Sequence, residues 1–239
     1  MNIIHWFKGL LKPEKIKNKK VIYTIIFGEY DYLKEPEFIS PDFDYICFTD
    51  IPDLKSEIWK IKLIKLKNKT NLKRCAAALI TNPFKYLAKY DLSVLVGGQI
   101  SIHCDISEFI RTVLPLYKSI AIMHHPVRDC IYEEAEAVLE LKKEFQCVVN
   151  KQMDKYRRLR YPEHNGLVSS GIVVRRHNDK KLKKHCKLWH QEIKKHSQRD
   201  QLSFNFVLWK YKLIDPAYFS RNFRTKDFIV HLHNFVQRF

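Results

Sequence analysis

Two kinds of side chain in this sequence could do chemistry because of where they stand along the chain. Asp50 ends an apolar, strand-like run, and Asp200 opens a helical segment. A carboxylate at such a boundary either caps the element or accepts a hydrogen bond or a proton from a ligand. His231 and His233 stand two residues apart at the end of a strand-like segment, so both would point the same way. They are either a pair of metal ligands or ordinary surface histidines.

Standard catalytic signatures are absent from the sequence. It holds no GxGxxG, P-loop, HExxH or GxSxG motif, and its six cysteines form no CxxC pair. Nothing has the spacing of a zinc or redox site. Without a secretory signal, we expect reduced thiols and a cytoplasmic protein. No apolar run approaches the roughly 18 residues that a membrane span requires.

The charge balance predicts anionic ligands. Lysine and arginine number 43 against 26 acids, which gives a net charge of +17 over 239 residues. Nucleotide phosphates, acidic glycans and anionic membranes all suit such a balance. The stretch 175–199 alone holds ten basic residues against two acids, and it is either a binding face or a solvated helix. Specific nucleic-acid binding is not expected, because no recognition module or aromatic-studded basic face is present.

The first twenty residues form a distinct extension. Their apolar residues recur at helical spacing (Ile3, Ile4, Phe7, Leu10 and Leu11), and lysines surround or follow them. This pattern is typical of an interfacial helix lying on the inner face of an anionic membrane, which would make the protein a peripheral one. The alternative is a short helix that packs on its own domain, followed by a solvated linker.

Strand-like and helical segments alternate through residues 21–239. Strands are predicted at 21–28, 43–49, 58–66, 93–96, 120–123, 167–174 and 228–232. Helices are predicted at 71–90, broken or kinked at Pro83, and at 129–145, 180–196 and 201–211. This order predicts one α/β domain with a mostly parallel central sheet flanked by helices. The binding loops should follow Phe27, Thr49, Val96, Met123 and Val174, at the carboxyl ends of strands.

Five segments together resemble one known family. They are YTIIFGEYD (23–31), DYICFTD (44–50), HPVRDCIYEEAEA (125–137), NGLVSSGIVVRRHN (165–178) and RDQLSFNFVLWK (199–210). Their order and spacing resemble the glycosyltransferase-like domain shared by bacterial surface-polysaccharide proteins and plant proteins linked to turgor regulation and seed mucilage. The resemblance covers about residues 21–232. It implies a Rossmann-like GT-A fold and transfer of a sugar from a nucleotide-diphosphate donor to a glycan or lipid-linked acceptor.

The resemblance also implies roles for individual residues. Nucleotide-sugar contacts would come from Tyr23, Thr24, Phe27, Gly28, Asp50, Arg74, Gly97, Gly98 and Gln99. The sugar and acceptor pocket would be formed by His125, Arg128, Glu133, Asn165, Gly166, Gly171, Gln201 and Asn205. Asp200 would contact the donor sugar or take the proton of the acceptor hydroxyl, and Arg199 and Asp129 would complete the catalytic set. Structural alternatives stay open: Tyr23 and Phe27 as core aromatics, and Glu133 as a complement to a helix dipole.

Two departures from the family pattern concern the metal. Gly97-Gly98-Gln99 stands where the family carries an acidic metal-binding motif, and Ser169 stands where it carries another acid. Mn²⁺ and Mg²⁺ prefer carboxylate oxygens. The resemblance therefore leaves three possibilities: metal-independent transfer, in which cations of the chain neutralise the diphosphate; a metal held by His231 and His233; or a catalytically silent nucleotide- or glycan-binding protein on the same fold.

Overall fold

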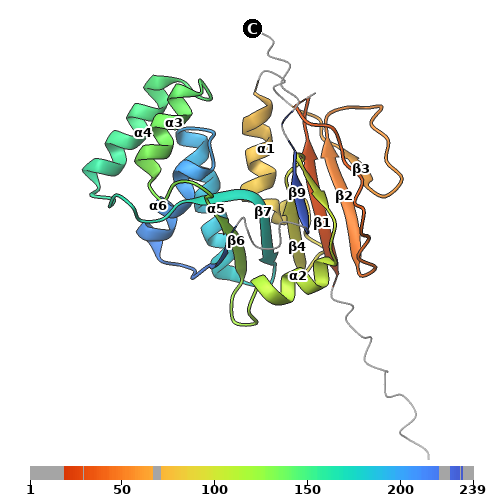
Figure 1. Cartoon of the computed structure of the whole chain (residues 1–239). Coiled ribbons are helices and arrows are strands. Elements are labelled where there is room, and N and C mark those ends of the chain that lie inside the picture. Colours follow the sequence, from red (N-terminus) through yellow and green to blue (C-terminus); the bar gives the residue numbers. More distant parts are fainter. Residues whose placement is uncertain (1–18, 29, 67–70, 221–226, 232, 234–239) are drawn as a thin grey trace, which may run out of the picture.

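The computed structural model describes residues 19–28, 30–66, 71–220, 227–231 and 233 (Figure 1). The predicted extension, residues 1–20, lies outside the described residues except at its end. There the backbone N–H of Lys19 donates to the Asp91 carboxylate over 3.0 Å, and Lys20 begins the first strand. A deletion that spares this strand would therefore end at residue 18.

A seven-stranded sheet in the order β3-β2-β1-β4-β7-β6-β8 forms the centre of the fold. Its strands are β1 (Lys20–Ile26), β2 (Phe43–Thr49), β3 (Lys60–Leu63), β4 (Leu92–Val96), β6 (Ile120–His124), β7 (Val168–Arg176) and β8 (Ala217–Phe219). All neighbours are parallel except β7, which runs antiparallel to both β4 and β6. The prediction of an α/β fold with a mostly parallel sheet is confirmed.

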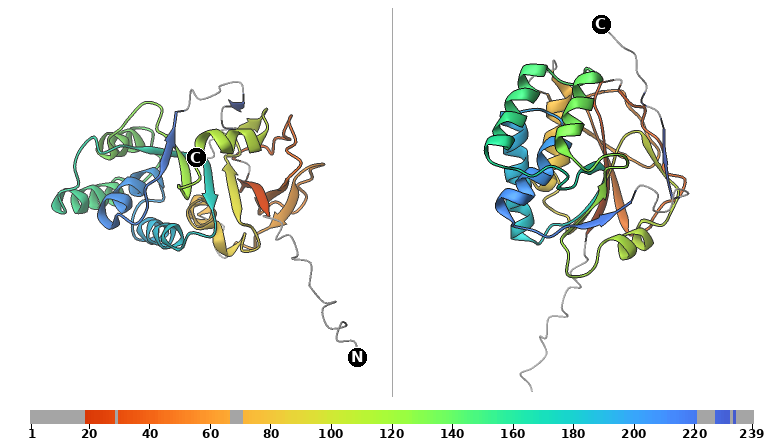
Figure 2. Two further views of the ribbon diagram at one scale, coloured as in Figure 1. Left: turned by 90° about the horizontal axis from the view of Figure 1, so that it is seen from below. Right: turned by 60° about the vertical axis from the view of Figure 1, so that its left-hand side comes forward.

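Both faces of the sheet are buried. Along β1, Val21 and Tyr23 join the hydrophobic cluster on one face, while Ile22 and Ile26 join the cluster on the other. This alternation follows from the two-residue period of a strand, and it explains why β1 is mostly apolar. One face is covered by α1 and by the helices after β6, and the other by α2 and a small ribbon of β5 and β9 (Figure 2).

The helices partly follow the prediction. They are α1 (Leu72–Thr81), α2 (Ile106–Val113), α3 (Ile131–Glu140), α4 (Gln146–Arg158), α5 (Lys180–Lys195) and α6 (Gln201–Tyr211). The predicted helix 71–90 ends at Thr81, and Pro83 opens a 3₁₀ turn, Pro83–Lys85. The predicted helix 129–145 is α3 alone. The short α2, β5 (Ile100–Ile102) and β8 were not predicted, and neither was α4; the last predicted strand is β9 (Phe228–Val230).

The direction of β7 corrects one prediction. The hairpin of α3 and α4 returns the chain to the edge where β6 ended. Strand β7 therefore starts at that edge and runs antiparallel to β6. The loop after Val174 therefore lies at the opposite edge from the carboxyl ends of β1 and β4. The start of β7, with Ser169 and Ser170, takes its place beside them.

Two buried histidines make stability depend on pH. Burial, together with the nearby Arg175 charge, lowers the pKa of His177 and of His185 to about 4. His177 shares a 2.8 Å hydrogen bond with Ser93, whereas neither ring nitrogen of His185 has a hydrogen-bond partner among the described residues. The unfolded chain, with ordinary histidine pKa values near 6.5, binds more protons between pH 6.5 and 4. Stability is therefore fully present above pH 6.5 and falls as the pH drops through this window.

We predict that His185→Leu makes this fall shallower by about 1.4 kcal/mol per pH unit, because one proton-binding group is removed from the unfolded state. Urea unfolding of variant and parent at several pH values between 4 and 7 measures the difference. At pH 7 the variant should keep its stability, since the ring it loses has no polar partner to leave behind. An unchanged pH slope would contradict the assignment.

Candidate functional site

A cavity of about 370 Å³ opens where β1 and β4 end and β7 begins. Its walls come from β1, α1, β4, β7 and the start of α6. Its polar and glycine residues include Asp31, Lys73, Gly97, Gly98, Gln99, Ser169, Ser170, Gly171, Gln198, Arg199, Asp200, Gln201 and His233. The structure thus brings together Phe27, the glycine motif, Gly171 and the Arg199–Gln201 segment from the predicted set.

Asp31 is a cavity residue that the sequence reasoning missed. It is only 9% exposed, and its Oδ1 lies 2.9 Å from Nδ1 of His233. A Cβ on Gly98 would lie 3.1 Å from the Asp31 carboxylate and 2.6 Å from the Ile26 side chain, so the glycine leaves room for this close approach. The glycine motif itself carries no acid, and the carboxylate that lies beside it comes from Asp31, in the segment after β1. Its position soon after the end of β1 is the sequence signal that could have identified it as a cavity residue.

Asp200 is directed into the cavity and does not cap its helix. It is the N-cap residue of α6, yet its side chain makes no capping hydrogen bond. Its Oδ2 instead accepts a hydrogen bond from the Ser170 hydroxyl. The backbone is fixed as well, because the Asp200 carbonyl accepts from Trp189 Nε1 over 3.0 Å. The carboxylate is therefore held toward β7 at the cavity wall.

Cations gather beside the same cavity. Burial and the nearby Arg199 charge lower the pKa of Lys73, and burial, Arg199 and Lys73 lower the pKa of Lys143. The Arg199 guanidinium donates to Gln201 over 3.0 Å, while its buried Nε has no partner among the described residues. Mutual repulsion of this kind is relieved by an anion, so the arrangement favours a negatively charged ligand.

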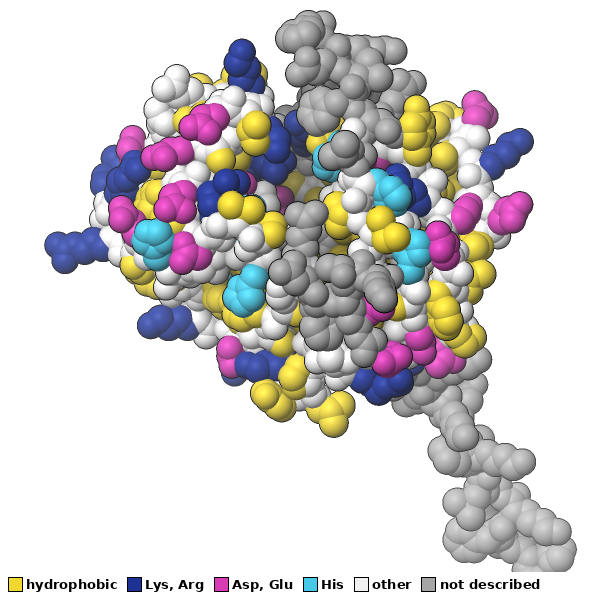
Figure 3. Space-filling view, in the orientation of Figure 1, with side chains coloured by type: hydrophobic (Ala, Val, Ile, Leu, Met, Phe, Trp, Pro, Cys, Tyr) yellow, Lys and Arg dark blue, Asp and Glu magenta, His cyan; other side chains and the backbone are white. Residues whose placement is uncertain are grey.

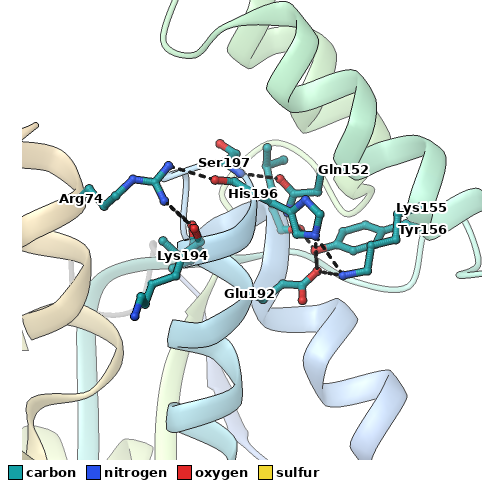
Figure 4. A network of polar contacts seen from close by, with 10 residues as sticks. Arg74, Gln152, Lys155, Tyr156, Glu192, Lys194, His196 and Ser197 are labelled. Atoms are coloured by element: carbon teal, nitrogen blue, oxygen red, sulfur yellow. Dashed lines mark hydrogen bonds and ion pairs between the residues drawn. The ribbon is translucent and has the colours of Figure 1, made fainter.

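A polar network holds the loop that carries Arg199 and Asp200 (Figure 4). Arg74 of α1 donates to the carbonyls of Ile193, Lys194 and His196 at 2.9, 3.0 and 3.1 Å, at the end of α5. Gln152 of α4 accepts from the Ser197 N–H over 3.1 Å. Arg74, expected to hold a diphosphate, is thus committed to helix carbonyls, whose partial negative charge attracts a cation.

Glu144 fixes the next step of that loop. Its Oε2 accepts from the Ser197 hydroxyl over 3.1 Å and from the Gln198 N–H over 3.0 Å. The loop is therefore tied to α1, to α4 and to the segment between α3 and α4 before it reaches the cavity. These contacts position Arg199 and Asp200, although Arg74, Gln152 and Glu144 do not line the cavity.

The predicted residues at the end of β1 divide between core and turn. Tyr23 is fully buried and its hydroxyl donates to the Leu79 carbonyl over 3.3 Å; Thr24 is also buried, and neither lines the cavity. Gly28 adopts φ +59°, and its N–H donates to Asp50 Oδ1 over 2.8 Å. Asp50 therefore closes the turn, which is the structural alternative given above, and contact of Tyr23 with a nucleotide would require removing it from the core.

Of the predicted sugar and acceptor residues, Gly171 and Gln201 line the cavity, whereas His125, Arg128 and Glu133 do not. Arg128 pairs with Glu134 at 2.7–2.8 Å, and His125 lies 3.6 Å from the same oxygen. Glu134 is buried, whereas the predicted Glu133 is exposed. Burial lowers the pKa of His125, and the Glu134 charge opposes this.

The remaining predicted residues make local contacts away from the cavity. Asp129 and Glu133 form an exposed group with His164, with the Asp129 carboxylate 2.7 Å from the ring. Gly166 adopts φ +81° and packs against Asn205, whose amide donates to the Asn165 carbonyl over 3.5 Å. None of these residues lines the cavity.

The two C-terminal histidines do not face one site. His231 lies 2.7 Å from the Ser101 hydroxyl, whereas His233 points to Asp31 in the cavity. The strand ends at Val230, so strand alternation no longer relates the two side chains. The expectation of a paired orientation was wrong, and His233 alone remains beside the cavity.

The comparison with known families bears on this site. Residues 53–233, more than half of the chain, match the family model described as TOD1/MUCI70, glycosyltransferase-like domain. The chain belongs to this family. Within the TOD1/MUCI70 match lie the glycine motif, β7 and the Arg199–Asp200 segment, whereas β1 and β2 precede it. A search of curated proteins found no match. None of the helices in the described part of this TOD1/MUCI70 protein is both long and apolar enough to span a bilayer.

We predict that Arg74→Met lowers the free energy of unfolding by about 1–3 kcal/mol, because three carbonyls at the end of α5 lose a charged donor. Arg111→Met is the matched control, since Arg111 is exposed on α2 and should change stability by less than about 0.5 kcal/mol. Urea unfolding measures both variants. Equal stability of the two would show that the Arg74 tether contributes nothing.

Proposed function

We propose that this protein transfers a sugar from a nucleotide-diphosphate donor, bound in the cavity, to a glycan or lipid-linked acceptor in bacterial surface-polysaccharide synthesis. The proposal rests on one observation. A single cavity of a glycosyltransferase-like domain holds both a carboxylate and a group of cations. Asp200 supplies the carboxylate, and Lys73 and Arg199 supply the lining cations.

In the proposed reaction, the bond between the sugar carbon and the diphosphate oxygen breaks, and a bond from that carbon to the acceptor oxygen forms. The nucleoside diphosphate leaves with the electron pair. Asp200 accepts the proton of the acceptor hydroxyl, in an orientation set by its hydrogen bond from Ser170. Lys73 and Arg199 stabilise the negative charge that grows on the leaving diphosphate.

The cavity fits a resident divalent cation poorly. Gly97-Gly98-Gln99 offers an amide in place of carboxylates, and Asp31 already lies against His233. Lys73 and Arg199 line the same cavity and would repel a metal ion. We therefore propose metal-independent transfer, in which fixed cations do the work of charge neutralisation.

A second candidate is a catalytically silent nucleotide- or glycan-binding protein on this fold. Its support is the absence of a carboxylate at Gly97 and at Ser169, both of which line the cavity. Such a protein would keep the cation group and its affinity for nucleotide-diphosphates. It differs from the transferase only in turnover.

We predict sugar-nucleotide hydrolysis or transfer that survives EDTA, measured across UDP-, GDP- and CMP-sugars with Mn²⁺, Mg²⁺ or chelator. Asp200→Asn should lower the rate about 10²–10⁴-fold, because a general base is lost, while nucleotide binding persists. Asp53→Asn, at an exposed carboxylate, is the matched control and should keep the parent rate.

Three outcomes would revise the proposal. Activity abolished by EDTA would place a metal in the cavity, with Asp31 and His233 as its first candidate ligands. Nucleotide binding without turnover in the parent protein would favour the silent binder. Full activity in Asp200→Asn would remove that residue from the chemistry.

A further inference from the structure

Two apolar side chains project from the edge of the sheet opposite the cavity. Leu116 and Tyr117, between α2 and β6, are 92% and 84% exposed, more than any other large hydrophobic side chain among the described residues. The Lys118 N–H donates to the Pro115 carbonyl over 3.0 Å, which makes this segment a tight turn with the two side chains at its tip. Hydrophobic side chains gather at the lower margin of the molecule in Figure 3.

This turn is held firmly by polar contacts behind it. Arg176 of β7 donates to the Lys118 carbonyl over 3.1 Å and to the Leu114 carbonyl over 3.3 Å. The Lys118 ammonium pairs with Asp215. Leu116 and Tyr117 are thus presented to solvent on a braced turn and do not fold back onto the domain.

Several exposed lysines lie at the same edge of the sheet as this turn. Arg176 pairs with Leu92 at the start of β4, next to Asp91, which holds the backbone of Lys19. Four residues after Arg176, α5 opens with four exposed lysines: Lys180, Lys181, Lys183 and Lys184. Lys85 and Lys89, before β4, are exposed as well.

The acids of this edge are largely engaged. Asp179 caps α5 by accepting from the Leu182 N–H over 2.9 Å, Asp215 pairs with Lys118, and Asp91 accepts from Lys19. The four exposed lysines at the start of α5 outnumber the two acids near them, Asp179 and Asp91. Exposed apolar side chains at a lysine-rich edge match the chemistry of an anionic bilayer surface. Protein interfaces, in contrast, are depleted in lysine.

Residues 1–18 enter the domain at this edge, through Lys19. Their sequence carries the apolar residues Ile3, Ile4, Phe7, Leu10 and Leu11 with interspersed lysines. The segment directly before Lys19 thus has a membrane-binding composition of its own. Two such elements in one chain favour a lipid surface over a soluble partner, since stable peripheral binding usually takes two signals.

We propose that this edge docks the protein on an anionic bilayer, with Leu116 and Tyr117 entering the headgroup region and the lysines of α5 pairing with lipid phosphates. The inference does not rest on the proposed transferase activity. Each side chain of this size adds about a factor of ten or more to partitioning when it leaves water. The turn therefore contributes to membrane affinity beyond the N-terminal segment.

The test is sedimentation of the full chain with vesicles of phosphatidylcholine, with and without phosphatidylglycerol. We expect binding to the anionic vesicles that weakens with salt, and a loss of about tenfold or more in L116D/Y117D. L141D/F145D is the matched control, because Leu141 and Phe145 are 59% and 77% exposed on another part of the surface. Circular dichroism confirms that each variant is folded.

A second variant, expected to bind vesicles more tightly, gives a test that does not depend on a loss of binding. L116W should bind anionic vesicles more tightly, with a blue shift of its added fluorescence on binding. Unchanged vesicle binding in L116D/Y117D, or an L116W emission that vesicles do not alter, would overturn the proposal, and residues 1–18 would then account for any binding. Equal binding to phosphatidylcholine alone would also overturn it, because the lysines would have no role.

Discussion

The antiparallel pairing of β7 with β4 is the contact on which the rest of the structure depends. It places the Gly171 carbonyl 2.8 Å from the Gly97 N–H, and so sets the start of β7 against the end of β4. From that position Ser170 reaches Asp200, and the start of β7 forms part of the cavity wall. At the other end of the same strand, Arg176 braces the turn that presents Leu116 and Tyr117. One reversed strand thus organises both edges of the sheet.

The same strand carries an unusual charge into the core. Arg175 is fully buried, with its guanidinium donating to the Tyr23 hydroxyl over 3.2 Å and to the Ile80 carbonyl over 2.6 Å. These partners are neutral, so the charge acts on its surroundings, and it helps to keep His177 and His185 deprotonated. A buried cation held by dipoles is costly to leave unpaired, which makes the fit of β7 against β1 and α1 sensitive to substitution.

The sequence predicted those helices and strands whose apolar residues recur with a clear period. It failed where the contacts that decide a residue's role come from residues far along the chain. The strand 43–49 and the helix 201–211 have the bounds expected from their apolar runs. Helix α4 was not expected because polar and charged residues together dominate it, although Val149, Met153 and Tyr156 recur at helical spacing and are buried. The partners of Arg74 lie more than a hundred residues away, so its contacts with the end of α5 could not be read from local pattern.

Candidate site residues divide in the same way. The rule that ligands bind at strand ends selected Phe27 and the glycine motif, which do line the cavity. It did not reveal that β7 is reversed, because strand direction is set by the helical hairpin before it. Asp31 was passed over for a related reason: its approach to Gly98 depends on packing between the segments that follow β1 and β4, and not on its own neighbours.

The two ends of the sheet have a consequence for the reach of an acceptor. The seven residues of β1 separate the cavity from the lysine-rich edge by about 23 Å, the length of an extended strand of that size. In a molecule resting on that edge, the cavity would lie at the end of the sheet that is farther from the lipid. An acceptor sugar fixed close to its lipid would stop short of the cavity, whereas a chain of several sugar units would span the gap. The distance between the two ends of the strands would then set the minimum length of an acceptor that can reach the cavity.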